Sequence, residues 1–217
     1  MELIPQLIGL IMGILGGYSL LLAARKRYPG LDEFLKRLTA SWQPDEATSI
    51  EDDLENTPAA GWQIRRDALY ALAESDDKQA AVTELIAALN DDDLDVRETA
   101  GQILAGMGKE AVPALLEIVT DGRMEARIEA TKSLGMIGDA QARQPLRIIA
   151  REDQSIWVRV AALEALGRIG GDVLPVLTDA LNDSESMIQE AAIRGLQYMD
   201  TRNARKLLQQ YHIRRVK

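Results

Sequence analysis

Cysteine is absent from the 217-residue chain, and histidine occurs only once, as His212 near the C-terminus. Without cysteine the chain can form neither a disulfide bond nor a thiolate metal site. A single histidine cannot build a histidine metal site either. We therefore expect no metal site, no cofactor-binding site and no redox role, and we expect His212 to lie on the surface.

Strand signals are equally scarce. Aromatic residues make up 4% of the chain, runs of β-branched residues are rare, and no Asn-Gly or Asp-Gly pair separates two alternating segments. Alanine and leucine are abundant instead, and 47% of the residues are hydrophobic, which is enough for a substantial core. The composition therefore predicts an all-α fold.

Positive charge is also in short supply, because 25 basic residues face 34 acidic ones and leave a formal net charge of −9. Such an acidic body repels a phosphate backbone, so we expect no nucleic-acid partner. The chain contains no phosphate-binding loop, nucleophile elbow or dinucleotide-binding motif. These absences predict a protein without catalytic residues, and therefore not an enzyme.

The longest uncharged run, residues 3–24, stands at the N-terminus. At about 1.5 Å per helical residue it can cross a hydrocarbon core of about 30 Å. Three basic residues, which we expect at the membrane surface, follow the run: Arg25, Lys26 and Arg27. A cleaved signal peptide carries its positive charge before the apolar run, so we predict a transmembrane anchor over residues 1–28, with the N-terminus outside and the rest cytoplasmic. A buried core helix or a signal peptide is the alternative.

Three glycines four residues apart, Gly9, Gly13 and Gly17, lie on one face of the predicted anchor. This spacing favours close packing against a partner helix in the membrane, although glycine is common in membrane helices for other reasons. Residues 29–42 are predicted to form an amphipathic helix that lies on the membrane or caps the first repeat. Residues 43–59, rich in acids and bounded by prolines, are predicted to be a linker.

A helical repeat occupies residues 60–217. Its five copies share an alanine at intervals of 32, 30, 32 and 30 residues: Ala68, Ala100, Ala130, Ala162 and Ala192. A leucine follows each alanine by four residues: Leu72, Leu104, Leu134, Leu166 and Leu196. In the three middle copies a glycine follows the alanine by eight residues: Gly108, Gly138 and Gly170. We predict a first helix that ends at a left-handed glycine, and then a second helix that begins near a proline.

The turns between repeats carry recurring charges. Acids follow the second helices at four places: Asp91, Asp121, Glu152 and Asp183. Arginines stand early in the next first helices: Arg97, Arg127 and Arg159. We predict that the acids cap the following helices and pair with the arginines, which would form a ladder along the repeats. Because they recur once per repeat, we interpret them as structural.

The pattern (V/I)-R-x-x-A-x-x-x-L-x-x-x-G resembles HEAT repeats, and most closely the short variety found in the phycobilisome (bilin) lyases of cyanobacteria. The resemblance covers residues 60–211 and implies a right-handed α-solenoid of about five helix pairs, here preceded by one transmembrane helix. Similar arrays include bilin lyases, chromophore-detaching factors, assembly factors and adaptors, so the resemblance is more specific for fold than for function.

The repeats also supply an internal control for surface exposure. Trp157 stands where the three preceding repeats have Gln63, Asp95 and Glu125, and Met187 follows in the next repeat. Tyr70 likewise stands where the other copies carry polar residues. We therefore predict that the two positions are exposed and that Trp157, Met187 and Tyr70 are protein-binding residues, with isolated exposed apolar side chains as the alternative.

Taken together, the anchor and the solenoid predict a membrane-tethered scaffold or assembly factor. Its expected partner is a membrane protein complex, with a photosynthetic complex in the thylakoid membrane as one candidate. The alternative is a bilin lyase or chromophore chaperone, which rests on the repeat subtype alone.

Overall fold

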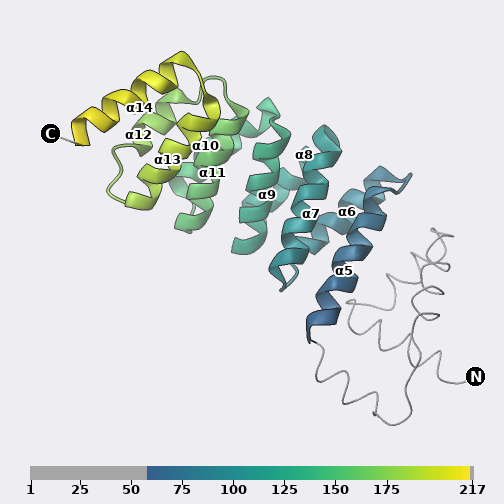
Figure 1. The fold of residues 1–217 in the computed structure, drawn as a ribbon. Coiled ribbons are helices and arrows are strands. Elements are labelled where there is room, and N and C mark those ends of the chain that lie inside the picture. Colours follow the sequence, from purple (N-terminus) through teal and green to yellow (C-terminus); the bar gives the residue numbers. More distant parts are fainter. Residues whose placement is uncertain (1–57, 216–217) are drawn as a thin grey trace, which may run out of the picture. The chain divides into compact units, whose positions relative to one another are not determined.

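The computed structural model describes residues 58–215, which form α-helices joined by turns and contain no strand (Figure 1). The helices are α5 (Pro58–Ala73), α6 (Lys78–Ala88), α7 (Leu94–Met107), α8 (Val112–Asp121), α9 (Met124–Ile137), α10 (Arg143–Glu152), α11 (Ile156–Ile169), α12 (Leu174–Ala180), α13 (Ser186–Met199) and α14 (Arg202–Arg215). Two short 3-10 helices, η1 (Gly108–Ala111) and η2 (Ala140–Ala142), precede α8 and α10. The all-α prediction is confirmed for these residues.

The chain divides into two compact units between Arg65 and Arg66, inside α5. In the second unit the odd-numbered helices α7, α9, α11 and α13 pack against their neighbours in sequence order (Figure 1). Each even-numbered helix connects two successive odd-numbered helices along the chain, and α8 and α10 each pack against the first helix of the next pair. This is the predicted arrangement of stacked helix pairs.

Glycines end the first helices as predicted. Gly108, Gly138 and Gly170 have φ values of 69°, 75° and 67°, which lie in the left-handed region that side chains rarely adopt. The amides of Gly138 and Gly170 donate to carbonyls in the last turn of their helices. In the last repeat Asp200, with φ 41°, takes this place.

The recurring leucines form the core. Leu104, Leu134, Leu166 and Leu196 are completely buried, as are leucines of the second helices: Leu85, Leu115, Leu146 and Leu177. Burying such a side chain contributes about 1.5–3 kcal/mol. The core-facing side of α14 is less buried. Leu207 and Tyr211 are only half-buried and Gln210 is exposed, as expected of the last helix of a repeat array.

The arginine ladder differs from the prediction in its acceptors. Arg97 Nη1 donates to the carbonyl oxygens of Asp91 and Asp92 at 2.7 and 2.8 Å, and Arg159 Nη1 donates to that of Asp153 at 2.7 Å. In the last repeat Gln189 donates to a carbonyl in the same way. The turns present unpaired helix-end carbonyls to these side chains, so the predicted pairing with carboxylates is wrong here.

The predictions for residues 1–28 and 29–42, with their glycine and basic sites, lie outside the described residues. The predicted linker 43–59 overlaps the start of α5, which begins at Pro58. Between residues 58 and 215, no helix has the length and apolar character that crossing a membrane requires.

Candidate functional site

The first helices present one continuous surface, which we call the first-helix face. On α11 it contains Trp157, Ala161, Glu164 and Arg168, spaced at i, i+4, i+7 and i+11, so these residues lie along one side of the helix. The equivalent residues of α9 are Glu125, Glu129, Lys132 and Met136. Those of α13 are Met187, Ala191, Arg194 and Tyr198.

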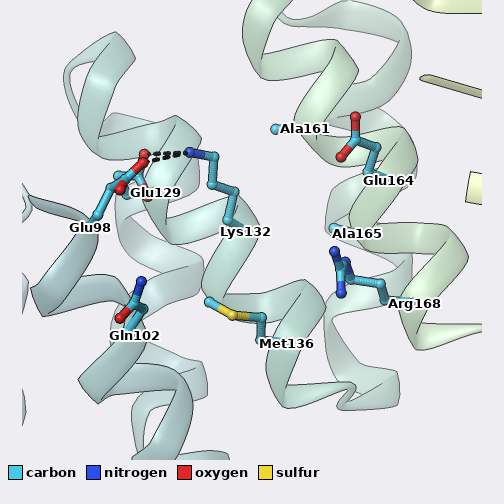
Figure 2. Close-up of a pocket in the computed structure, with 9 residues that line it drawn as sticks. All are labelled: Glu98, Gln102, Glu129, Lys132, Met136, Ala161, Glu164, Ala165 and Arg168. Carbon is cyan, nitrogen blue, oxygen red and sulfur yellow. Dashed lines mark hydrogen bonds and ion pairs between the residues drawn. The ribbon is translucent and has the colours of Figure 1, made fainter. Parts of the chain in front are cut away.

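A groove of about 260 Å³ crosses the first-helix face from α7 over α9 to α11 (Figure 2). Its lining combines Met136, Ala161 and Ala165 with three acids and two bases: Glu98, Glu129, Glu164, Lys132 and Arg168. Figure 2 shows Lys132 turned toward α7, whereas Arg168 stands apart on α11. The two ends of the groove are therefore chemically different.

Small residues make the floor of this groove. Gly135 on α9 lies against α11 so closely that a Cβ on it would be 2.8 Å from the Cα of Ala165. Ala161 and Ala165 are themselves buried. Because neither helix carries a large side chain at this contact, a depression remains between the longer side chains on both sides.

The end of the groove near α7 holds one cation beside two carboxylates. Lys132 Nζ lies 2.8 Å from Glu129 Oε1 and 3.8 Å from Glu98 Oε1. Glu129 is buried, so this charge needs its partner. Farther along, Arg194 Nε donates to Glu164 Oε1 at 2.7 Å. These two cations are therefore occupied by carboxylates of the chain.

Arg168 differs from both. Its guanidinium carbon lies 3.8 Å from the ring centroid of Tyr198 on α13, which is a cation–π contact. Its Cδ would lie 3.6 Å from a Cβ on Gly135, so its stem crosses toward α9. Within residues 58–215 no carboxylate lies within ion-pair distance of this guanidinium. The arrangement is suited to binding an anion.

A second shallow groove lies over α10 and α12. There Arg147 Nη2 is 2.8 Å from Asp172 Oδ1, and the hydrogen bond from Arg147 lowers the pKa of the Asp172 carboxyl group. Arg151 pairs with Asp179 at 3.0 Å. These arginines are neutralised by neighbouring acids, so this surface offers less to an anionic ligand.

Acidic, basic, amide and apolar side chains line the two grooves. Their linings include no serine, cysteine or histidine. In the described part of the chain, no group of three or more His, Cys, Asp or Glu side chains is placed to hold a metal ion. The first-helix groove offers an open surface of charged and apolar side chains on which a ligand can bind.

Two of the predicted protein-binding residues lie on the surface as expected: Trp157 is 55% and Tyr70 is 52% exposed. Met187 is only half-buried, so it contributes less surface than predicted. Sequence reasoning missed Met136, which is 48% exposed, and Tyr198, which is 43% exposed, together with Arg168 between them. All three stand six residues after the repeat alanine, a position at which α7 has Gly106. The same comparison between repeats could therefore have found Met136 and Tyr198 as exposed apolar side chains, but not Arg168.

The chain is similar to proteins named as lyase subunits. It is 32% identical over 150 residues to the phycocyanobilin lyase subunit alpha of Nostoc sp. PCC 7120, covering 68% of this chain and 47% of the relative. It is 28% identical over 166 residues to the protein of the same name from Picosynechococcus sp. PCC 7002, covering 68% and 60%. The chain thus spans about half the length of these relatives. The uncharacterized phycocyanin operon protein Z of Pseudanabaena tenuis is 25% identical over 146 residues, covering 64% and 72%.

The fold is similar to that of a solved complex. A chain in the complex of CpcE and CpcF of phycocyanin lyase from Nostoc sp. PCC 7120 superposes with a TM-score of 0.55 at 27% identity. The superposition covers 61% of this chain and 86% of that chain.

These similarities contradict the predicted function. The sequence predicted a membrane-tethered scaffold that is not an enzyme, located in a membrane and partnered by a membrane protein complex. The relatives indicate otherwise, because they are named as lyase subunits and the solved neighbour is a lyase complex. The prediction gave the N-terminal apolar run more weight than the repeat subtype. The alternative reading, a bilin lyase or chromophore chaperone, fits the relatives better.

The repeat assignment itself is confirmed. The sequence pattern of HEAT repeats matches residues 55–123, 82–167 and 145–213, which overlap and include every helix from α5 to α13. The match covers well over half of the chain, and the described residues have the helix pairs that it requires. The chain belongs to the HEAT-repeat family.

Proposed function

We propose that the chain is a subunit of a bilin lyase that handles phycocyanobilin together with a second HEAT-repeat subunit. The observation that carries this proposal is the superposition on a chain of the CpcE–CpcF complex, which covers 86% of that chain. The 32% identity to a phycocyanobilin lyase subunit alpha supports the same assignment. A chromophore chaperone that binds pigment without transferring it is the second candidate, favoured by a groove whose lining contains no serine, cysteine or histidine nucleophile.

The chemistry of the chain is consistent with transferring a pigment to another protein. Phycocyanobilin is an open-chain tetrapyrrole that carries two propionate groups. This chain has no cysteine, so it offers no thiol of its own to the pigment. A shallow groove that holds a ligand non-covalently leaves most of the ligand accessible to an acceptor protein.

A reconstitution experiment tests this function. The full chain is expressed with the CpcF subunit of the Nostoc lyase, apo-phycocyanin and phycocyanobilin, and pigment that stays on phycocyanin after denaturation is measured. We expect attachment above the level obtained with CpcF alone. If the chain neither supports attachment nor binds phycocyanobilin, the proposal is wrong, whereas binding without attachment favours the chaperone.

The exposed aromatic residues are proposed to contact the partner subunit. Trp157 lies one turn before the groove residue Ala161 on α11, and more than half of its side chain is exposed. Exposed tryptophans are frequent hot spots of protein interfaces. Tyr70 and the half-buried Met187 are proposed to contribute at the margins of the same interface.

A further inference from the structure

We propose that Arg168, held by Tyr198, binds a propionate carboxylate of the pigment in the first-helix groove. This inference rests on the proposed function and names the recognition element of the site. It follows from three observations on the described residues: a guanidinium without an acidic partner, an aromatic ring that fixes it, and a groove that it lines.

The guanidinium is oriented in advance of ligand binding. Tyr198 occupies one face of the guanidinium at 3.8 Å, and the aliphatic stem of Arg168 crosses the close contact at Gly135. Stacking on a ring leaves the N–H groups of an arginine at the edge of its plane, where they can donate two parallel hydrogen bonds to a carboxylate. Because α9 and α13 both contact the side chain, little of its freedom remains to be lost when a ligand binds.

The neighbouring charges direct an anion to Arg168. Lys132 is occupied by Glu129 and Glu98, and Arg194 is occupied by Glu164. A carboxylate at any of these cations would have to displace a carboxylate of the chain. At Arg168 no carboxylate of the described residues has to be displaced, so the attraction there is not offset by a competing ion pair.

The part of the groove between α9 and α11 offers an apolar contact to a flat group. Its floor consists of Ala161 and Ala165, and the thioether of Met136 lines it on the α9 side. Methionine makes favourable contacts with conjugated rings and adapts to their shape. A volume of about 260 Å³ is smaller than an ordinary ligand pocket, so one propionate-bearing ring would be covered while the rest of the tetrapyrrole stays outside.

The test compares two forms of the pigment. The full chain and its variants are titrated with phycocyanobilin and with its dimethyl ester, in which both carboxylates are blocked, and dissociation constants are read from the absorbance change. We expect the wild-type chain to bind the free acid more tightly than the ester. Arg168→Gln should weaken the affinity for the free acid about tenfold or more and leave the affinity for the ester unchanged, because one charge-assisted, two-point contact is lost.

Two further variants separate charge from geometry. Arg168→Lys keeps the charge and loses the paired donors, so it should recover only part of the affinity for the free acid. Arg151→Gln removes an exposed arginine from α10, on another surface, and should change neither affinity. Circular dichroism of each variant confirms that the helices remain folded.

The outcomes distinguish this inference from the proposed function. If the wild-type chain binds the pigment but Arg168→Gln behaves like Arg151→Gln, the carboxylate site is wrong while the function stands. If the wild type binds the free acid and the ester with equal affinity, the carboxylate site is also wrong while the function stands. If the wild-type chain binds neither form, pigment binding by this chain and the carboxylate site both fail.

Discussion

Arg127 and Asp153 form a two-point ion pair across neighbouring repeats, with Nε to Oδ2 at 3.0 Å and Nη2 to Oδ1 at 2.9 Å. Both side chains are largely buried, with 18% and 9% exposure. Arg127 also donates to the carbonyl oxygen of Gly122, and the carbonyl oxygen of Asp153 accepts from Arg159. Two successive inter-repeat turns are thus linked through one arginine, although its acidic partner is Asp153 and not one of the four acids that the sequence predicted.

Removing either member of this pair should destabilise the array. Asp153→Ala deprives Arg127 of its partner and also removes the carboxylate that accepts the amide of Ser155. A partly buried charge then loses its partner, so we expect a loss of about 2–4 kcal/mol in the free energy of unfolding. Urea unfolding followed by circular dichroism measures this loss.

The matched control is the exposed pair of Arg123 and Asp92, separated by 3.6 Å and with Asp92 almost fully exposed. Asp92→Ala should change the unfolding free energy by less than about 0.5 kcal/mol, because exposed ion pairs contribute little. Equal losses for Asp92→Ala and Asp153→Ala would show that burial of the inter-repeat pair has no energetic effect.

Periodicity was sufficient to predict the helices but not the partners of the arginines. Leu134 and Gly138 are placed by rules that act within one repeat, namely core-facing spacing and the left-handed helix end, and both were predicted correctly. Arg97 could reach either carboxylates or carbonyls of the same turn, and only the path of the turn decides between them. Sequence spacing carries no information about that path.

The close contact between α11 and α13 depends on two glycines. A Cβ on Gly167 would overlap the backbone of Gly195, and both residues are buried. Gly167→Ala should therefore push the helices apart and destabilise the protein by about 1–3 kcal/mol or more. Thermal unfolding of the full chain measures the effect.

Gly106 provides the control for this substitution. It lies on α7, is exposed, and has no atom within 4 Å of the position that a Cβ would take. Gly106→Ala should leave the stability unchanged or raise it by about 0.5–1 kcal/mol, since alanine favours helices more than glycine does. If both substitutions stabilise the chain, α11 and α13 do not pack as closely as described.

The candidate site was less predictable than the fold. Trp157 was found because its counterparts in other repeats are polar, and it is exposed as expected. Arg168 gave no signal, because an arginine on a helix surface is ordinary unless its neighbours are known. Its importance arises from Tyr198, which is 30 residues away and meets it only when the repeats stack.

Glu84 on α6 should make stability depend on pH. Partial burial raises the pKa of its carboxyl group above the usual value. Its folded-state pKa therefore exceeds its unfolded-state pKa, and the stability that protonated Glu84 contributes is present at low pH and is lost as the pH rises through the folded-state pKa. Glu84→Gln should raise the melting temperature slightly at pH 7 and give no advantage once Glu84 is protonated.

Removing a negative charge from an acidic chain also reduces general repulsion, so the comparison needs a control. Glu117→Gln on the exposed side of α8 removes the same charge without relieving burial. Glu84→Gln should raise the melting temperature at pH 7 more than Glu117→Gln does. An equal gain from both would assign the effect to net charge and not to the burial of Glu84.

Trp157 should contribute to partner binding more than to folding. Its counterparts in other repeats are polar and 55% of its surface is exposed, so Trp157→Glu should change the melting temperature little, as surface substitutions usually cost within about 0.5 kcal/mol. Binding of the chain to the CpcF subunit, measured by titration calorimetry, should weaken by about 2 kcal/mol or more, as for a buried aromatic anchor.

Met187→Glu is measured separately, because its half-buried side chain contributes to packing as well as to the surface. Glu125→Ala changes the position that matches Trp157 one repeat earlier, and we expect it to affect neither folding nor binding. Unfolding of Trp157→Glu would mean that the indole belongs to the core between α9 and α11. A stable Trp157→Glu that still binds CpcF with wild-type affinity would place the interface elsewhere, and the second groove over α10 and α12 would then be the next surface to substitute.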